Sequence, residues 1–168
     1  KLTDDQNQKS RFENTSSGYR LATSVGGAAT GDGGDIVLID DPASSSDAQS
    51  SAMRTSVMEW WDQTMQTRLN DPKTGAFIII AQRLHEQDLC GHILSQELGN
   101  DWDHLMLPSR YEIGHPTPVR SSLGFTDPRT KEGDLLWPDR MDEKTVSNLE
   151  QSLGSYAAAG QLQQRPSP

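Results

Sequence analysis

A short apolar run that ends in two carboxylates constrains this 168-residue chain more than any other stretch. Residues 36–39 are Ile, Val, Leu and Ile, and Asp40, Asp41 and Pro42 follow directly. A continuous aliphatic run bounded by turn residues is typical of a strand buried on both faces, as in a parallel sheet covered by helices. Because ligands of such sheets bind at the carboxyl ends of the strands, the run predicts a site at Asp40 and Asp41.

Two adjacent carboxylates at a strand end have a chemical and a structural interpretation. In P-loop nucleotidases the first acid of such a pair, the Walker B element, holds Mg²⁺, and the next carboxylate orients or deprotonates the attacking water. Asp-Asp-Pro is also a common strand ending, because Asp favours turns and Pro cannot continue a ladder. The chemical interpretation is favoured by five glycines at positions 26, 27, 31, 33 and 34, which suit a mobile loop or backbone close to a ligand. These glycines are not a P-loop, because no GxxxxGK followed by Ser or Thr occurs in the chain.

A second buried strand is predicted at residues 76–81, AFIIIA, and a polar cluster at 82–86 follows it. Between the two strands, apolar residues recur at spacings of three and four, which predicts an amphipathic helix over about 48–69. Asp88 is expected to cap a further helix over about 89–98. This alternation of strands and helices predicts an α/β fold, in which the polar cluster joins Asp40 and Asp41 at one edge of the sheet.

Other stretches carry weaker signals. Residues 1–17 are polar and are expected to be a surface segment or a frayed helix, and residues 20–25 alternate weakly as a strand does. Residues 102–107 are interpreted as a third, shorter strand. We expect at least one of Trp60 and Trp61 to lie in the core, because aromatic residues on an apolar helix stripe are usually buried.

The chain changes character after Pro108. Prolines and basic residues are spread over a long connection, 110–138, which predicts a functional loop or an interdomain linker. Asp142 is expected to cap a helix that ends at Gly154, and a further short helix is expected to run to about residue 164.

Composition limits the classes of function. The formal net charge is −9 and the pI is near 4.8, which argues against a large nucleic-acid-binding face. Any contact with DNA is therefore expected to be local or to involve other parts of a longer protein. Cys90 is the single cysteine, so the chain forms no internal disulfide, and we expect this residue to be a packed helical side chain. No apolar run approaches membrane-spanning length, so we expect a soluble, cytosolic protein.

The sequence does not favour a zinc site near residue 85. His85, Glu86, Asp88 and His92 lie close together in sequence, but they do not form HExxH. The two histidines are seven residues apart with a helix start expected between them, whereas one helix side presents ligands three or four residues apart.

Taken together, these motifs resemble those of the large subunit of tailed-bacteriophage terminase, the DNA-packaging motor protein. The matching strings, in order, are GYRLATSVGG at 18–27, TG at 30–31, IVLIDDP at 36–42, EWW at 59–61, TRLNDP at 67–72, QRLHEQDL at 82–89 and LWP at 136–138. The resemblance implies an N-terminal P-loop-class ATPase domain, in which ATP hydrolysis drives double-stranded DNA into the capsid, and a C-terminal nuclease domain of the ribonuclease-H type.

The resemblance also implies roles for particular residues. Asp40 corresponds to the magnesium ligand of Walker B, and Asp41 to the catalytic carboxylate, where many relatives have Glu. Gln82 and Arg83 lie at the end of the second strand, in the motif that senses the γ-phosphate of ATP. Two further residues, Thr30 and Gly31, belong to a family motif and are candidates for cofactor binding.

The same resemblance divides the chain into three parts. Residues 1–108 correspond to the later part of the ATPase domain, 109–140 to an irregular connection, and 141–168 to a helical linker toward the nuclease domain. We therefore expect a segment of a longer protein, with an incomplete P-loop-like parallel sheet flanked by helices. The phosphate-binding Walker A loop is expected before Lys1 and the nuclease carboxylates after Pro168, so the isolated chain should hydrolyse little or no ATP.

For the parent protein, the resemblance implies ATP and Mg²⁺ as cofactors and the cytoplasm of the phage host as location. It implies double-stranded DNA, the small terminase subunit and the portal protein as partners, and a homo-oligomeric ring. Two alternatives stay open. One is an acidic metal-dependent phosphoesterase or nuclease that uses Asp40 and Asp41 with Glu86 or Asp88. The other is a non-enzymatic phage assembly module that binds its partners through residues 110–138.

Overall fold

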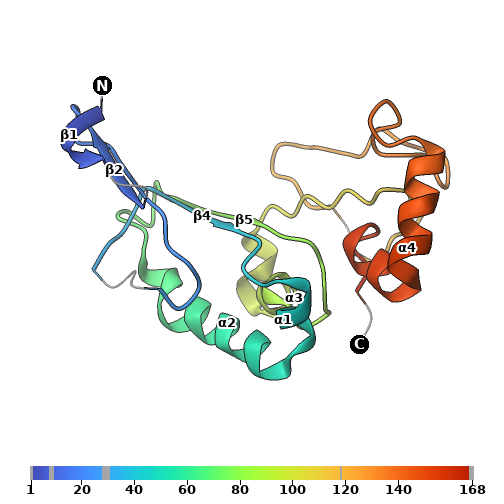
Figure 1. The fold of residues 1–168 in the computed structure, drawn as a ribbon, viewed down its shortest axis with the longest axis horizontal. Helices are drawn as coiled ribbons and strands as arrows, with labels where there is room; N and C mark the ends of the chain where they lie inside the picture. The colour runs from blue at the N-terminus through green and yellow to red at the C-terminus, as the bar shows by residue number, and fades with distance from the viewer. Residues whose placement is uncertain (1, 8–9, 28–30, 118, 167–168) are drawn as a thin grey trace. The chain divides into compact units, whose positions relative to one another are not determined.

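The computed structural model describes residues 2–7, 10–27, 31–117 and 119–166 of the chain. Within them lie five strands, four α-helices and two 3-10 helices (Figure 1). In chain order the elements are β1 (Leu2–Asn7), β2 (Arg11–Asn14), β3 (Tyr19–Leu21), β4 (Ile36–Asp40), α1 (Ser45–Gln49), α2 (Ser51–Gln63), a 3-10 helix (Met65–Thr67), β5 (Ala76–Ile80), α3 (Leu89–Ser95), a second 3-10 helix (Glu97–Asp101) and α4 (Glu143–Gln161).

Backbone contacts divide the chain into two compact units. The first unit consists of Lys1–Leu38 and Glu59–Ile78, and the second of Ile39–Met58 and Ile79–Pro168. The boundary crosses β4, α2 and β5, so each of these elements begins in one unit and ends in the other.

The N-terminal strands form an antiparallel sheet in the order β1-β2-β3. The turn from β2 to β3 is fixed by Asn14, whose side-chain oxygen accepts hydrogen bonds from the backbone N–H groups of Ser16 (2.9 Å) and Gly18 (3.1 Å). The frayed helix offered for residues 1–17 is therefore wrong, because β1 and β2 form there, whereas residues 10–17 are exposed or half-buried, as expected of a surface segment. The strand expected at 20–25 is confirmed only at its start, because β3 ends at Leu21. The polar composition hid the sheet, because these strands lack the apolar alternation of a half-buried strand.

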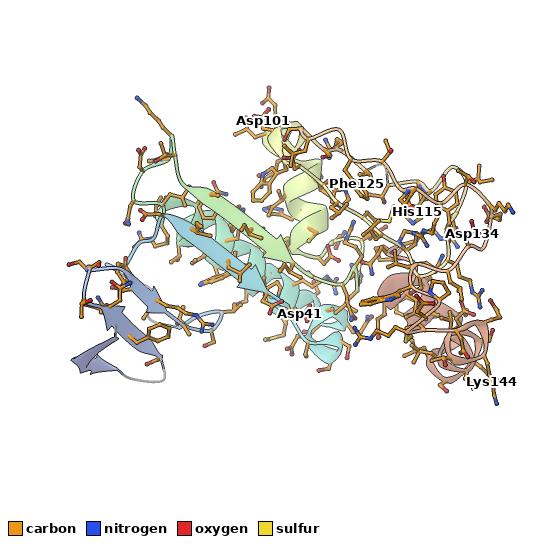
Figure 2. All side chains as sticks on the ribbon, turned by 90° about the horizontal axis from the view of Figure 1, so that it is seen from above. Asp41, Asp101, His115, Phe125, Asp134 and Lys144 are labelled. Carbon is orange, nitrogen blue, oxygen red and sulfur yellow. The ribbon has the colours of Figure 1, made fainter. Side chains whose placement is uncertain are left out.

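The two aliphatic runs form the parallel pair β4-β5, as predicted. At one end, the backbone N–H of Ala76 donates to the carbonyl of Asp35 (3.0 Å), and at the other the N–H of Asp41 donates to the carbonyl of Ile80 (2.9 Å). Figure 2 shows both arrows pointing in the same direction, toward the labelled Asp41. Both strands thus end at the same edge of the sheet. The fold is mixed α/β, with a small parallel sheet and flanking helices.

Burial of β4 and β5 differs from the prediction. Val37 and Ile39 of β4 and Phe77 of β5 are at least half-buried, and the ring of Phe77 packs edge-on against Trp61 of α2 at 5.1 Å. The alternate residues are exposed, as shown by Ile36 (67%), Leu38 (57%), Ile78 (43%) and Ile80 (54%). The prediction that both faces of these strands are buried is therefore wrong, because every second residue of each strand is exposed.

The predicted helix over 48–69 is broken into α1, α2 and a 3-10 turn. Ser44 caps α1 in a capping box with Asp47, in which each side chain binds the backbone of the other. At the junction, Ser50 has extended backbone and interrupts the helix. The apolar stripe is confirmed from Val57 onward, since Val57, Trp61 and Met65 are each at most 6% exposed, whereas Met53 is 45% exposed. Trp61 is the core tryptophan that was expected.

The other predicted elements are confirmed in part. Asp88 caps α3, where Leu89 and Ile93 are buried. The strand expected at 102–107 is wrong, because only His104 pairs there, in an isolated antiparallel bridge with Arg120. Prolines lie close to both segments and lack the N–H that a longer ladder needs.

Ion pairs and a kinked helix organise residues 108–166. Helix α4 begins after the cap Asp142 and is kinked at Gly154, whose φ of 74° lies in the left-handed region that suits glycine, as the predicted helix stop implied. The guanidinium of Arg110 binds Glu143 and Glu150 of α4 at 2.7 Å each. The long connection, although irregular, is thereby tied to α4.

A second arginine holds the connection itself together. Arg129 pairs with Asp127 (2.7 Å), donates to the carbonyls of Pro108 and Asp134 (2.9 and 3.0 Å), and lies over the ring of Tyr111. Among the helices of the described residues, none is both long and apolar enough to cross a lipid bilayer.

Candidate functional site

The carboxyl ends of β4 and β5 form the edge of a small pocket. The hydrogen bond from Asp41 to Ile80 holds the two strand ends together. The cavity volume is about 30 Å³, which is room for a water molecule or two. Apolar side chains of the three helices α1, α2 and α3 and of the segments that follow the two strands line most of it. Its chemically distinctive lining residues are Asp41, Arg54, Gln82, Asp88 and Cys90.

Asp41 has an unusual backbone. Its φ is +42°, a conformation that most residues avoid and that Asp tolerates better than others. The strand thus turns sharply at the residue that the sequence nominated as catalytic, and backbone strain of this kind is common at functional sites. The side chain of Asp41 is exposed at the pocket.

Asp40 is the last residue of β4 and is also exposed. It lies in register with Ile36 and Leu38, so it belongs to the exposed face of the strand and is not part of the pocket lining. Within the described residues, neither Asp40 nor Asp41 forms a hydrogen bond or ion pair through its side chain. These two carboxylates fit Mg²⁺, which proteins commonly hold with one or two carboxylates while phosphates and water supply the other ligands. The described residues contain no group of three His, Cys, Asp or Glu side chains arranged to hold a metal by themselves.

Gln82 and Arg83 follow β5 and differ sharply in environment. Gln82 is exposed and lines the pocket. Arg83 is buried, and its Nε lies 3.0 Å from both carboxylate oxygens of Asp88. Asp88 in turn accepts a hydrogen bond from the N–H of Gly91 (2.8 Å) as the cap of α3. The guanidinium of Arg83 is therefore neutralised by an internal carboxylate.

The backbone of Arg83 is tied to α4 and the residues that follow it. Its N–H donates to the side-chain oxygen of Gln164 (3.1 Å). On the other side, Gly160 approaches so closely that a Cβ there would lie 2.6 Å from the carbonyl oxygen of Arg83. The end of β5 is thus held against the C-terminal part of the chain.

The remaining two predicted residues are Thr30 and Gly31. Thr30 lies outside the described residues. Gly31 is exposed, has a φ of +90° and belongs to the first compact unit. The strand ends therefore bring together Asp41, Gln82 and Arg83, with Asp40 adjacent.

One residue of the pocket was missed by the sequence reasoning. Arg54 on α2 is half-buried, and its Nη1 donates to the carbonyl of Ala48 (2.7 Å). Its Nε is buried without a hydrogen-bond partner, and no described carboxylate forms an ion pair with it. A signal was present, because Arg54 precedes Val57 by three residues and so lies on the stripe that continues to Trp61.

Cys90 is a packed side chain, as predicted. It lies on α3 and lines the pocket. Burial raises the pKa of its thiol to about 11, with the charge of Asp88 adding to this effect and that of Arg83 opposing it. The thiol is thus protonated at neutral pH and is a poor nucleophile.

Comparisons with known proteins add no family to this description. No protein-family model matches the chain, and no curated protein matches it.

Proposed function

We propose that this chain is part of a terminase large subunit, in which ATP hydrolysis drives double-stranded DNA into a viral capsid. One observation carries the proposal: two parallel strands end side by side, with Asp40 and Asp41 after the first and Gln82 and Arg83 after the second. Nucleotides bind at such strand ends in open α/β sheets. The order of the motifs along the chain provides the second support.

In this function Asp40 and Asp41 have separate roles. Bound Mg²⁺ supplies neutralisation of charge on the β- and γ-phosphates. Asp40 holds the metal through its carboxylate, which has no internal partner among the described residues. Asp41 orients the attacking water and accepts its proton. Because Asp is shorter than Glu, its reach depends on the sharp turn at its backbone.

The remaining parts of the motor belong to this proposal as well. The P-loop that binds the nucleotide phosphates, and the nuclease that cuts DNA, are assigned to other segments of the parent protein. Its partners are double-stranded DNA, the small terminase subunit, the portal protein and further copies in a ring, all in the host cytoplasm. Because the net charge of −9 disfavours a large DNA-binding face on this chain, contact with DNA involves local features or those other segments.

Two contacts weigh against parts of the two alternatives. In the phosphoesterase that uses Glu86 or Asp88, Asp88 is a poor third metal ligand, because its carboxylate already pairs with Arg83 and caps α3. In the module that binds partners through residues 110–138, Arg110 and Arg129 are poor contacts for an acidic partner, because internal carboxylates already neutralise them.

A paramagnetic metal tests the proposed magnesium site. Mn²⁺, added in small amounts to the isotope-labelled chain, should broaden amide NMR signals of residues 39–43 and 81–83 before others. Replacing both acids, Asp40→Asn with Asp41→Asn, should abolish this local broadening. The matched control, Asp139→Asn, removes an exposed carboxylate from a turn elsewhere and should leave it unchanged. Broadening that survives the double replacement would contradict the proposal.

A further inference from the structure

We infer that Arg54 is the cation of this pocket that binds a phosphate group, in place of Arg83. The inference rests on the proposed function for its choice of a nucleotide as the source of that group. It adds a binding residue that is identified neither by its position at the carboxyl end of a strand nor by the terminase resemblance.

Arg54 has unused binding capacity. The residue is half-buried and lines the pocket, and within the described part of the chain its guanidinium forms one hydrogen bond, to the carbonyl of Ala48. Its buried Nε has no acceptor, and no described carboxylate neutralises its charge. A buried donor without an acceptor is costly, so an oxygen that reaches Nε gains a hydrogen bond without displacing another partner.

Arg83 has no such capacity. Its Nε is 3.0 Å from both oxygens of Asp88, and the two side chains are only 10% and 13% exposed. A phosphate that recruited Arg83 would leave a buried carboxylate unpaired and would remove a partner from the residue that caps α3. Of the two arginines, Arg54 is therefore the one that an anion engages at lower cost.

The size and charge of the site define the ligand. The cavity of about 30 Å³ admits one oxygen of an anion and excludes a whole nucleotide, which would lie at the mouth beside Asp41 and Gln82. Guanidinium N–H groups match the oxygens of phosphate in geometry and charge. Because Asp41 also lines the pocket and Asp40 is adjacent, a bare anion is repelled. The ligand is thus a phosphate group that carries Mg²⁺.

Chemical-shift titrations of the 168-residue chain test this inference. The probes are ATP with Mg²⁺, inorganic phosphate with Mg²⁺, and adenosine, which lacks the phosphate. We expect the first two to shift signals around Arg54, and adenosine not to. Arg54→Gln should weaken binding of the phosphate probes at least tenfold. Arg20→Gln, which removes the same charge from an exposed site, should not change it.

A second variant keeps the test valid if Arg54→Gln does not fold. Arg54→Lys retains the positive charge and a donor for the carbonyl of Ala48, but it lacks the second donor that Nε provides. We expect it to fold and to bind the phosphate probes at least threefold more weakly than the unaltered chain.

The outcomes separate this inference from the proposed function. Binding of the phosphate probes that is unaffected by both Arg54 variants overturns the inference, and so does the absence of binding to the unaltered chain at millimolar concentrations. If phosphate binding depends on Arg54 but the parent protein hydrolyses no ATP, the inference stands and the proposed function fails. If the parent hydrolyses ATP and neither Arg54 variant affects its nucleotide affinity, the proposed function stands and the inference about Arg54 fails.

Discussion

At the scale of single residues, arginines in this chain differ mainly in what neutralises them. Arg83 and Arg129 are almost fully buried, and each is paired with one aspartate. Arg110 bridges two glutamates on α4, which raises its pKa further above its ordinary value. Arg54 has no such partner among the described residues. The difference separates arginines that hold the fold together from one that is available to a ligand.

The Arg129–Asp127 pair predicts a pH dependence of stability. Hydrogen bonds from Arg129 lower the pKa of the Asp127 carboxyl, which is only 12% exposed. The pair therefore stabilises the fold above the unfolded pKa of about 4, and this contribution is lost as the pH falls through the lower pKa of the folded state. Asp127→Asn should lower the free energy of unfolding by about 1 kcal/mol at pH 7 and by much less at pH 3.

Urea unfolding at both pH values measures this effect. Asp139→Asn, at an exposed turn, is the matched control, and its free energy of unfolding should differ little from that of the unaltered chain at both pH values. If Asp127→Asn lowers the free energy of unfolding by the same amount at both pH values, the charge of Asp127 does not contribute to stability.

At the scale of elements, sequence periodicity predicted those that bury an apolar stripe. Strands β4 and β5 were predicted within a residue or two of their ends from their continuous apolar runs. The spacing of three and four located the apolar stripe of α2, but it did not show the break at Ser50 or the end of α2 at Gln63. The hairpin of β2 and β3 is polar and is held by a turn around Asn14, so periodicity gave no signal. Residues 102–107 have a strand-like pattern but lack a neighbouring strand, which no local pattern reports.

The uneven burial of β4 predicts unequal losses of stability for two neighbouring substitutions. Ile39 is 5% exposed and Leu38 is 57% exposed. Ile39→Ala should lower the free energy of unfolding by about 2–5 kcal/mol, because it leaves a cavity in the core. Leu38→Ala should change it by less than about 0.5 kcal/mol. Denaturant unfolding of both variants measures this contrast, and equal losses would show that both faces of the strand are buried.

At the scale of the whole molecule, the candidate site lies in the second of two compact units. Its outline was predictable, because strand ends collect functional residues and the sequence marks both ends with polar side chains: Asp40, Asp41 and Gln82. The pairing of charges within the site was not predictable. The pairing of Arg83 with Asp88, and the free capacity of Arg54, depend on which side chains meet after folding, and the spacing of residues does not encode this.

The proposed motor function predicts the behaviour of the parent protein that contains this chain. The measurement is Mg²⁺-dependent ATP hydrolysis by that protein and by its Asp40→Asn and Asp41→Gly variants. Glycine is chosen at position 41 because it suits the φ of +42°, so that a loss of activity reports the missing carboxylate instead of backbone strain. Asp139→Asn again serves as the control.

We predict that both variants lose at least about 100-fold in kcat, as expected for loss of a metal ligand or of a general base, while the protein still binds nucleotide. The control should keep the full rate. Hydrolysis at full rate in both variants, or none in the unaltered parent, would show that Asp40 and Asp41 only end a strand.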